Sequence, residues 1–399
     1  MNKDEENKDR FCYNSIHEVC SMQEKRMKKR LLVYVNSMNA LGGIERVIAN
    51  LTKVLVDYYD IVILVKDVPV SAYALDERVK MDTINAKLTM NMNSRIQRIL
   101  SVPLNIIKSK RMLKKWLKSH KDIDYVYTAF PTNGIEMYFA DKKLRNRIVA
   151  SEHASYYAYN SIYKKMKEWL YPRLNVISVP TTMDTEIYQN LGYKASYIPH
   201  LSTYTAQENI NPDSRVAINV GRLTSDKQQM LLLEMWESVN KRMPGHEWKL
   251  QIIGSGEEED RLQAYIDEHN MTNVQMVPHT SHIDEYYKNA GLFLFTSKME
   301  GFGMVLLEAM SFGVPCISFD CPSGPRDMIR DGENGYLIPC YDKERFVERV
   351  CEYICDNNGK QAYMKENAKN VVASWDNNRI IELWNNIFSE MERKNRNED

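Results

Sequence analysis

The sequence contains no long apolar segment. Nowhere do about eighteen or more apolar residues follow one another, which is the length that a membrane-spanning helix needs. The first fifteen residues, MNKDEENKDRFCYNS, carry too many charges for a secretory signal peptide. We therefore expect a cytoplasmic protein.

Cysteines are few and lack the spacing of metal ligands. The chain has seven, an odd number, and no Cys-x-x-Cys pair. This pattern predicts free thiols in a reducing compartment, with no zinc site. Cys351 and Cys355 lie one helical turn apart, a spacing more typical of a core stripe than of a ligand pair. We expect no metal and no cofactor.

Net charge and internal repeats are also absent, but the charge is unevenly placed. The whole chain has 53 basic and 53 acidic residues. Residues 1–200 hold 32 Lys and Arg against 21 Asp and Glu, and the remaining residues hold 21 against 32. The split predicts that the first half meets something anionic. A chain of 399 residues is also too long for one ordinary core, so we expect two domains.

One stretch of the second half predicts a ligand site. The apolar run Leu292–Thr296 is typical of a buried parallel strand, and Met304–Phe312 of a helix, with Glu300-Gly301-Phe302-Gly303 between them. The first N–H groups of a helix have no partner within it, so the amides of Gly303, Met304 and Val305 are candidates for binding an anion. The two glycines would let a phosphate or sugar come close.

Two glutamates flank this helix start. Glu300 lies in the loop and Glu308 in the helix, and with one of them in a loop both can point at one ligand. Carboxylates only accept hydrogen bonds, which suits the hydroxyls of a sugar and a ribose. A pair of glutamates alone is more often solvated surface, but the strand, glycine loop and helix around them favour a site.

The stretch EGFGMVLLEAMSFGVPCISFDCPSGPRDMIRDGENGYLIP closely resembles the nucleotide-sugar signature of the retaining family-4 glycosyltransferases. The resemblance implies the GT-B fold: α/β, two facing Rossmann-like domains with an interdomain cleft, and a C-terminal helix that crosses back to the first domain. It also implies that Glu300 holds sugar hydroxyls and Glu308 the ribose diol. The turn Cys321–Arg326 resembles that of enzymes of bacterial surface-polysaccharide assembly, which suggests a uridine donor and a lipid-linked acceptor.

A second motif begins the second half. A strand ends at Gly221, and Arg222 and Lys227 follow five residues apart before a helix. This would suit a diphosphate clamp, although loop cations are usually solvated. The resemblance implies that Gly-Arg-Leu-x-x-x-Lys is the donor-diphosphate motif. The family's usual glycine after the lysine is Gln228 here, which we expect to alter the loop's shape more than its charge.

Three further candidates follow predicted strands, where doubly wound sheets bind ligands. Gly42 and Gly43 separate a strand from a helix, and from geometry alone a simple turn is as good an interpretation. The resemblance implies that their Gly-Gly-x-Glu loop faces the donor phosphates and the acceptor. The second candidate is His153, which by the same resemblance contacts the donor sugar and its reaction centre. The third is His279, which lies where the family holds the nucleobase with backbone groups.

Two motifs are rejected. Gly254-Ser255-Gly256 lacks the third glycine of a dinucleotide site and precedes three glutamates that would repel a pyrophosphate. Asp122-Ile123-Asp124 resembles a metal-binding carboxylate pair but starts a strand, which is the wrong end for a site.

A basic amphipathic stretch, Met92–Lys118, admits two interpretations. It could lie on an anionic bilayer, or it could face the core and expose an ordinary solvated basic face. The charge split favours the membrane, so we expect peripheral contact with the inner face of the plasma membrane. Pro103 is expected to divide the stretch into two helices.

These observations predict a retaining glycosyltransferase that moves a hexose or N-acetylhexosamine from a nucleoside-diphosphate sugar, preferably a UDP-sugar, to a glycan or lipid-linked acceptor, with no nucleic-acid partner. The alternatives are a nucleotide-sugar epimerase of the same fold and a non-catalytic glycan-binding or scaffold descendant. The expected parts are a disordered leader (1–30), an acceptor-side domain (31–200), a donor-binding domain (201–373) and a helix packing on the first domain (374–399).

Overall fold

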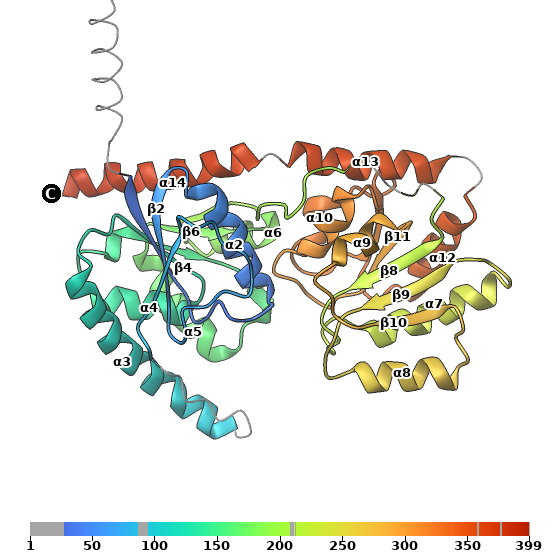
Figure 1. Ribbon diagram of the computed structural model, residues 1–399, viewed down its shortest axis with the longest axis horizontal. Coiled ribbons are helices and arrows are strands. Elements are labelled where there is room, and N and C mark those ends of the chain that lie inside the picture. The colour runs from blue at the N-terminus through green and yellow to red at the C-terminus, as the bar shows by residue number, and fades with distance from the viewer. Residues whose placement is uncertain are drawn as a thin grey trace, which may run out of the picture.

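The structure is a computed structural model that describes residues 28–86, 95–207, 211, 213–356, 359–375 and 377–398. Figure 1 shows two α/β domains side by side, with two C-terminal helices running along both of them. The predicted leader lies outside the described residues except for residues 28–30, and its last two residues begin the first strand. None of the described helices has both the length and the apolar character needed to cross a membrane.

The first domain is built on a parallel sheet of seven strands in the order β3-β2-β1-β4-β5-β6-β7. Its central strands are short apolar runs that are buried on both faces, as parallel strands covered by helices must be. The strands are β1 (Lys29–Tyr34), β2 (Tyr59–Val65), β3 (Lys80–Thr83), β4 (Tyr125–Thr128), β5 (Ile148–Ser151), β6 (Val176–Val179) and β7 (Ala195–Tyr197). The helices are α2 (Gly43–Leu55), α3 (Arg95–Ser119), α4 (Pro131–Ala140), α5 (Ser161–Leu170) and α6 (Thr182–Asn190).

The second domain repeats the plan with six parallel strands in the order β10-β9-β8-β11-β12-β13. The strands are β8 (Val216–Val220), β9 (Lys249–Ile253), β10 (Val274–Val277), β11 (Leu292–Phe295), β12 (Cys316–Phe319) and β13 (Gly335–Ile338). The helices are α7 (Gln229–Arg242), α8 (Glu259–Glu268), α9 (Ile283–Lys288), α10 (Met304–Ser311), α11 (Pro325–Met328), α12 (Lys343–Ile354) and α13 (Lys360–Ser374). The predicted pair of Rossmann-like sheets is confirmed.

The strand order places the candidate loops. In the first sheet it reverses direction between β1 and β4, and in the second between β8 and β11. Open parallel sheets bind ligands outside the carboxyl ends of the strands at such a switch point. The loops that follow β1, β8 and β11 carry Gly42 and Gly43, Arg222 and Lys227, and Glu300.

The last helix, α14 (Asn377–Glu398), returns to the first domain. Its apolar face joins the core formed by β1, β2 and β4, with Trp384 4% exposed and its ring 5.7 Å from that of Tyr127. The α14 residues of this core are Ile380, Ile381, Trp384, Ile387, Phe388 and Met391. The predicted crossing helix is therefore confirmed, and part of the first domain's core is supplied by the far end of the sequence.

The prediction that Pro103 divides the basic stretch was wrong, since α3 continues through it as one helix of 25 residues. A proline removes one backbone hydrogen bond, while packing farther along, where Leu113 and Leu117 are buried against the first domain, holds this helix in place. Trp116 donates from Nε1 to Asp82 at 2.7 Å. This part of α3 therefore faces the core.

Removal of a contact between α14 and the core of the first domain should destabilise that domain. Trp384→Ala takes a large ring from a buried site, and core truncations of this size cost about 3–5 kcal/mol. We expect a lower midpoint of the thermal transition that involves the first domain, measured by calorimetry. Glu390→Ala, at an exposed position of the same helix, is the control and should change stability by no more than about 0.5 kcal/mol.

Candidate active site

Lys227 and Glu300, predicted separately, form an ion pair between Nζ and Oε1. Both side chains are largely buried, 22% and 11% exposed. Their loops are tied together, because the Thr296 hydroxyl donates to the carbonyl of Lys227 at 3.1 Å. The loops after β8 and β11 therefore form one unit in which a cation meets a carboxylate at the switch point.

Gln228 explains why a glycine is usual at its position. Its backbone lies in the left-handed region, with φ 56° and ψ 38°, which is unfavourable for residues other than glycine. The residue still caps α7 with its carbonyl, which accepts from Leu232 at 3.2 Å. Gln228 thus holds a left-handed conformation that a glycine would adopt without steric cost.

Two other predicted donor residues lie at the surface. Arg222 is exposed in the same loop as Lys227. His279 is exposed after β10, and its backbone N–H donates to Ser255 Oγ at 3.3 Å. A nucleobase at His279 would therefore meet its carbonyl rather than its amide.

The start of α10 has the geometry expected of an anion site. Gly303 caps the helix with φ 89°, a conformation that favours glycine, and Met304 and Val305 form the first turn. Gly301 has a use that the sequence did not reveal. A Cβ there would lie 2.0 Å from the carbonyl oxygen of His153, so this glycine lets the backbones of the two domains meet.

His153 therefore lies at the domain boundary. Its Nε2 and the Tyr127 hydroxyl are 2.8 Å apart, its ring stacks on His200 with centroids 5.3 Å apart, and its Nδ1 is buried without a hydrogen-bond partner among the described residues. Burial lowers the pKa of His153 to about 3. The imidazole is neutral at ordinary pH, so it can donate or accept one proton but cannot supply a cation.

Glu308 is the most enclosed residue of the predicted site, with its side chain 1% exposed. Oε1 accepts from Arg46 Nη1 at 2.6 Å and from Thr203 Oγ1 at 3.0 Å, and Oε2 accepts from the Tyr287 hydroxyl at 3.0 Å. Sequence reasoning missed these three partners. Only Arg46 has a signal in the sequence, because it directly follows the Gly-Gly-x-Glu motif.

The glycine pair begins α2, the helix that carries Arg46. Gly42 is the cap residue, and the Glu45 carboxylate folds back so closely that a Cβ on Gly42 would lie 2.3 Å from it. The contact of Arg46 with Glu308 brings the start of α2 to the boundary. Gly42 and Gly43 are thus on the side of the first domain that faces the second.

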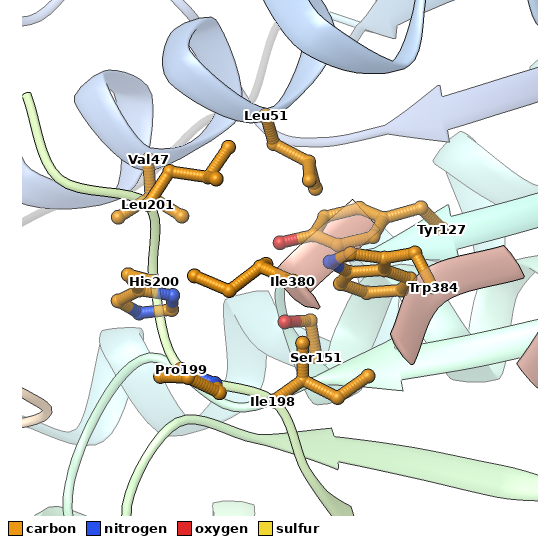
Figure 2. A pocket seen from close by; sticks show the side chains of 10 residues that line it. All are labelled: Val47, Leu51, Tyr127, Ser151, Ile198, Pro199, His200, Leu201, Ile380 and Trp384. Atoms are coloured by element: carbon orange, nitrogen blue, oxygen red, sulfur yellow. The ribbon is translucent and has the colours of Figure 1, made fainter. Parts of the chain in front are cut away.

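A small pocket lies in the first domain. Figure 2 shows side chains from α2, β4, β5, the segment 198–201 and α14 around it, with Tyr127, Ser151, His200 and Trp384 among them. Two of these lining residues, Tyr127 and His200, also contact the His153 ring. The histidine and the pocket are thus linked through shared neighbours.

Two family models match the chain. The first is described as Glycosyl transferases group 1 and matches residues 202–371; the second, Glycosyltransferase Family 4, matches residues 41–200. The first covers all strands of the second sheet, and the second covers the first sheet except β1. The chain is a glycosyltransferase of the GT-B fold. The predicted family, fold and enzyme class are confirmed.

Two relatives are similar in sequence to this glycosyltransferase. The amylovoran biosynthesis glycosyltransferase AmsD of Erwinia amylovora is 24% identical over 379 residues, which cover 90% of this chain and 99% of the relative. A lipopolysaccharide 1,6-galactosyltransferase of Salmonella typhimurium is 35% identical over 185 residues, 45% of this chain and 50% of the relative.

Solved structures agree with the fold. A mutant of S. aureus TarM in complex with Fondaparinux, alpha-GlcNAc-glycerol and UDP superposes with a TM-score of 0.75 at 17% identity, covering 90% of this chain and 99% of that one. The pneumococcal O-GlcNAc transferase GtfA, in complex with UDP and GlcNAc, gives 0.73 at 16% identity, covering 92% and 99%.

The depressed pKa of His153 predicts part of the enzyme's acid sensitivity. Below pH 6.5 the unfolded chain binds a proton at this residue, whereas the folded protein binds it only near pH 3. The free energy of unfolding therefore decreases as the pH falls through this range. His153→Gln removes this linkage. Between pH 7 and pH 5 the variant should lose about 1–2 kcal/mol less of its unfolding free energy than the wild type. Denaturant titrations at both pH values measure this, with the exposed His282→Gln as control.

An equal loss of stability in His153→Gln and the wild type would contradict the buried neutral state. A change of the same size in His282→Gln would attribute the effect to histidine content in general.

Proposed function

We propose that this glycosyltransferase moves a hexose or N-acetylhexosamine from a UDP-sugar to a glycan or lipid-linked acceptor in polysaccharide biosynthesis, with retention of anomeric configuration. The observation that carries the proposal is the Lys227–Glu300 pair, held beside the start of α10 at the carboxyl ends of β8 and β11. The names of AmsD and of the Salmonella galactosyltransferase support the pathway, and the UDP in the TarM and GtfA complexes supports the donor.

In this proposal each domain binds one of the two substrates. The donor binds mainly to residues 201–373, and the acceptor meets residues 31–200 with the Gly42-Gly43 loop. His153 lies at the sugar, where its backbone contacts Gly301 and its ring is neutral. His279 lies at the nucleobase and Glu308 at the ribose.

Cleavage of the sugar–diphosphate bond leaves negative charge on the departing phosphate. Preorganised donors stabilise such charge most effectively because they need no reorganisation during the reaction. Lys227, Arg222 and the first amides of α10 are the donors proposed for this task. The ion pair holds the Lys227 ammonium and the Glu300 carboxylate side by side, so we assign the ammonium to the diphosphate and the carboxylate to the adjoining sugar hydroxyls.

The reaction is tested by incubating the enzyme with radiolabelled nucleotide sugars and a membrane extract. Transfer of label to lipid or glycan supports the proposal. Conversion of the donor in the absence of an acceptor would indicate the epimerase alternative, and binding without turnover a scaffold protein. Either of these outcomes contradicts the transferase proposal.

Removal of either member of the ion pair should abolish transfer. Lys227→Ala takes away a donor to the leaving phosphate, and Glu300→Ala an acceptor for the sugar. Loss of one such preorganised group typically lowers kcat about 10²- to 10³-fold. Lys298→Ala, an exposed lysine of the β11–α10 loop, is the matched control and should keep wild-type activity. Full activity in Lys227→Ala or Glu300→Ala would contradict the site.

We also propose that the first half of α3 contacts an anionic membrane at the cytoplasmic face. Leu104 and Ile107 are 67% and 43% exposed, and Lys108 and Arg111 are exposed beside them. This end of the helix projects from the first domain, while the opposite end packs on the core (Figure 1). Apolar side chains flanked by cations suit an anionic bilayer surface.

Vesicle co-sedimentation tests this contact. We expect binding to vesicles containing phosphatidylglycerol and little binding to phosphatidylcholine alone, with the difference reduced in high salt by screening. The double variant Leu104→Ser, Ile107→Ser should weaken binding about tenfold or more, since each loses an apolar side chain from the bilayer. Leu191→Ser, at another exposed leucine of the same domain, is the control. Equal binding of all forms to both vesicles would overturn the proposal.

A further inference from the structure

Arg46 reaches from the first domain to the carboxylate proposed for the donor ribose. It lies in the first turns of α2, and its Nη1 is 2.6 Å from Glu308 Oε1 on α10 of the second domain. The Arg46 side chain is 26% exposed and that of Glu308 1%. Exposed ion pairs contribute little, whereas a carboxylate this enclosed requires its partner.

The hydrogen bonds of Glu308 leave room for one more donor. A carboxylate oxygen offers about two acceptor positions. Those of Oε1 are filled by Arg46 and Thr203, whereas Oε2 accepts only from Tyr287 among the described residues. By hydrogen-bonding capacity, Oε2 therefore keeps one acceptor position, which suits a ribose hydroxyl, while Arg46 stays in place.

Two further contacts within reach of Arg46 and Glu308 support this pair, one from α2 and one from the segment between β2 and β3. Asn50, one turn after Arg46, donates to Thr203 Oγ1 at 3.2 Å, and Thr203 donates in turn to Glu308. The guanidinium of Arg46 also lies over the ring of Tyr73, 5.3 Å from its centroid. Burial alone would lower the pKa of Arg46, but the attraction and hydrogen bond of Glu308 raise it above its ordinary value, so the cation persists.

We propose that Arg46 is a positioning residue for donor recognition: from the first domain it fixes the Glu308 carboxylate, so that the ribose is recognised fully only when the two domains are in contact. This rests on the proposed function, since it takes Glu308 as the ribose-binding group. Nucleoside binding and domain contact then stabilise each other, because each requires the same orientation of one side chain.

The test compares nucleotides that differ by one hydroxyl. Binding of uridine diphosphate and of its 2′-deoxy and 3′-deoxy analogues is measured by calorimetry for the wild type, Arg46→Gln, Glu308→Gln and the double variant. A hydrogen bond to a charged group corresponds to roughly 10- to 100-fold in affinity. We expect the wild type to disfavour one analogue by about tenfold or more, and this preference to fall below about threefold in all three variants.

Two further variants control the experiment. Arg78→Gln, an exposed arginine of the same domain paired with Asp57 and Asp76, should keep the full preference. Arg46→Lys retains the charge but not the planar fork, and should restore part of the preference lost in Arg46→Gln. Because the preference is a ratio within one variant, a general loss of stability does not imitate it.

The outcomes separate the two proposals. If the wild type binds no uridine diphosphate, the proposed donor fails and this inference with it. If it binds and discriminates, and Arg46→Gln discriminates equally, only the positioning role is overturned. Tighter binding by Arg46→Gln than by the wild type would also overturn it, since Arg46 would then compete with the ribose.

Discussion

A carboxylate enclosed at the boundary between two domains is the constraint around which this glycosyltransferase is arranged. Glu308 is placed by α10 of the second domain, but one of its partners comes from α2 of the first and another from the connecting segment. Burial of an unpaired carboxylate costs several kcal/mol, so the charge of Glu308 favours the arrangement in which Arg46 faces it. The relative position of the two sheets is thereby coupled to the chemistry of the site.

Other contacts across the boundary also fix the relative position of the two domains. Gly301 accommodates the carbonyl of His153, and Ser323 donates to Asp184 of α6 at 2.6 Å. Asp327 in turn accepts from the backbone of Thr182 at 3.1 Å. These contacts join backbone or short side chains, which have little freedom, so they set the domain positions more sharply than long exposed ion pairs would.

Much of this organisation could be predicted from the sequence, because it depends on local pattern. The predicted strand Leu292–Thr296 and helix Met304–Phe312 are β11 and α10 to within one residue, and the expectation of two domains followed from length. What failed depended on tertiary packing. Pro103 stays helical because the rest of α3 packs on the core.

Arg46 escaped notice because the Gly-Gly-x-Glu motif before it marks the loop but not a partner 262 residues away. At Gln228, by contrast, the explanation is local. Its positive φ shows why a glycine is usual at this position. The strands were thus predictable, the loops partly so, and the pairings across the boundary not at all.

The return of α14 bears on how the protein is made. The core of the first domain includes Trp384 and Phe388, which a ribosome adds more than 180 residues after β7 has been completed. Domains commonly fold as they emerge, yet this one would wait with the apolar surface of β1 and β2 uncovered while the second domain is synthesised. The nascent first half is therefore the form of the molecule in which chaperone binding is expected to matter most.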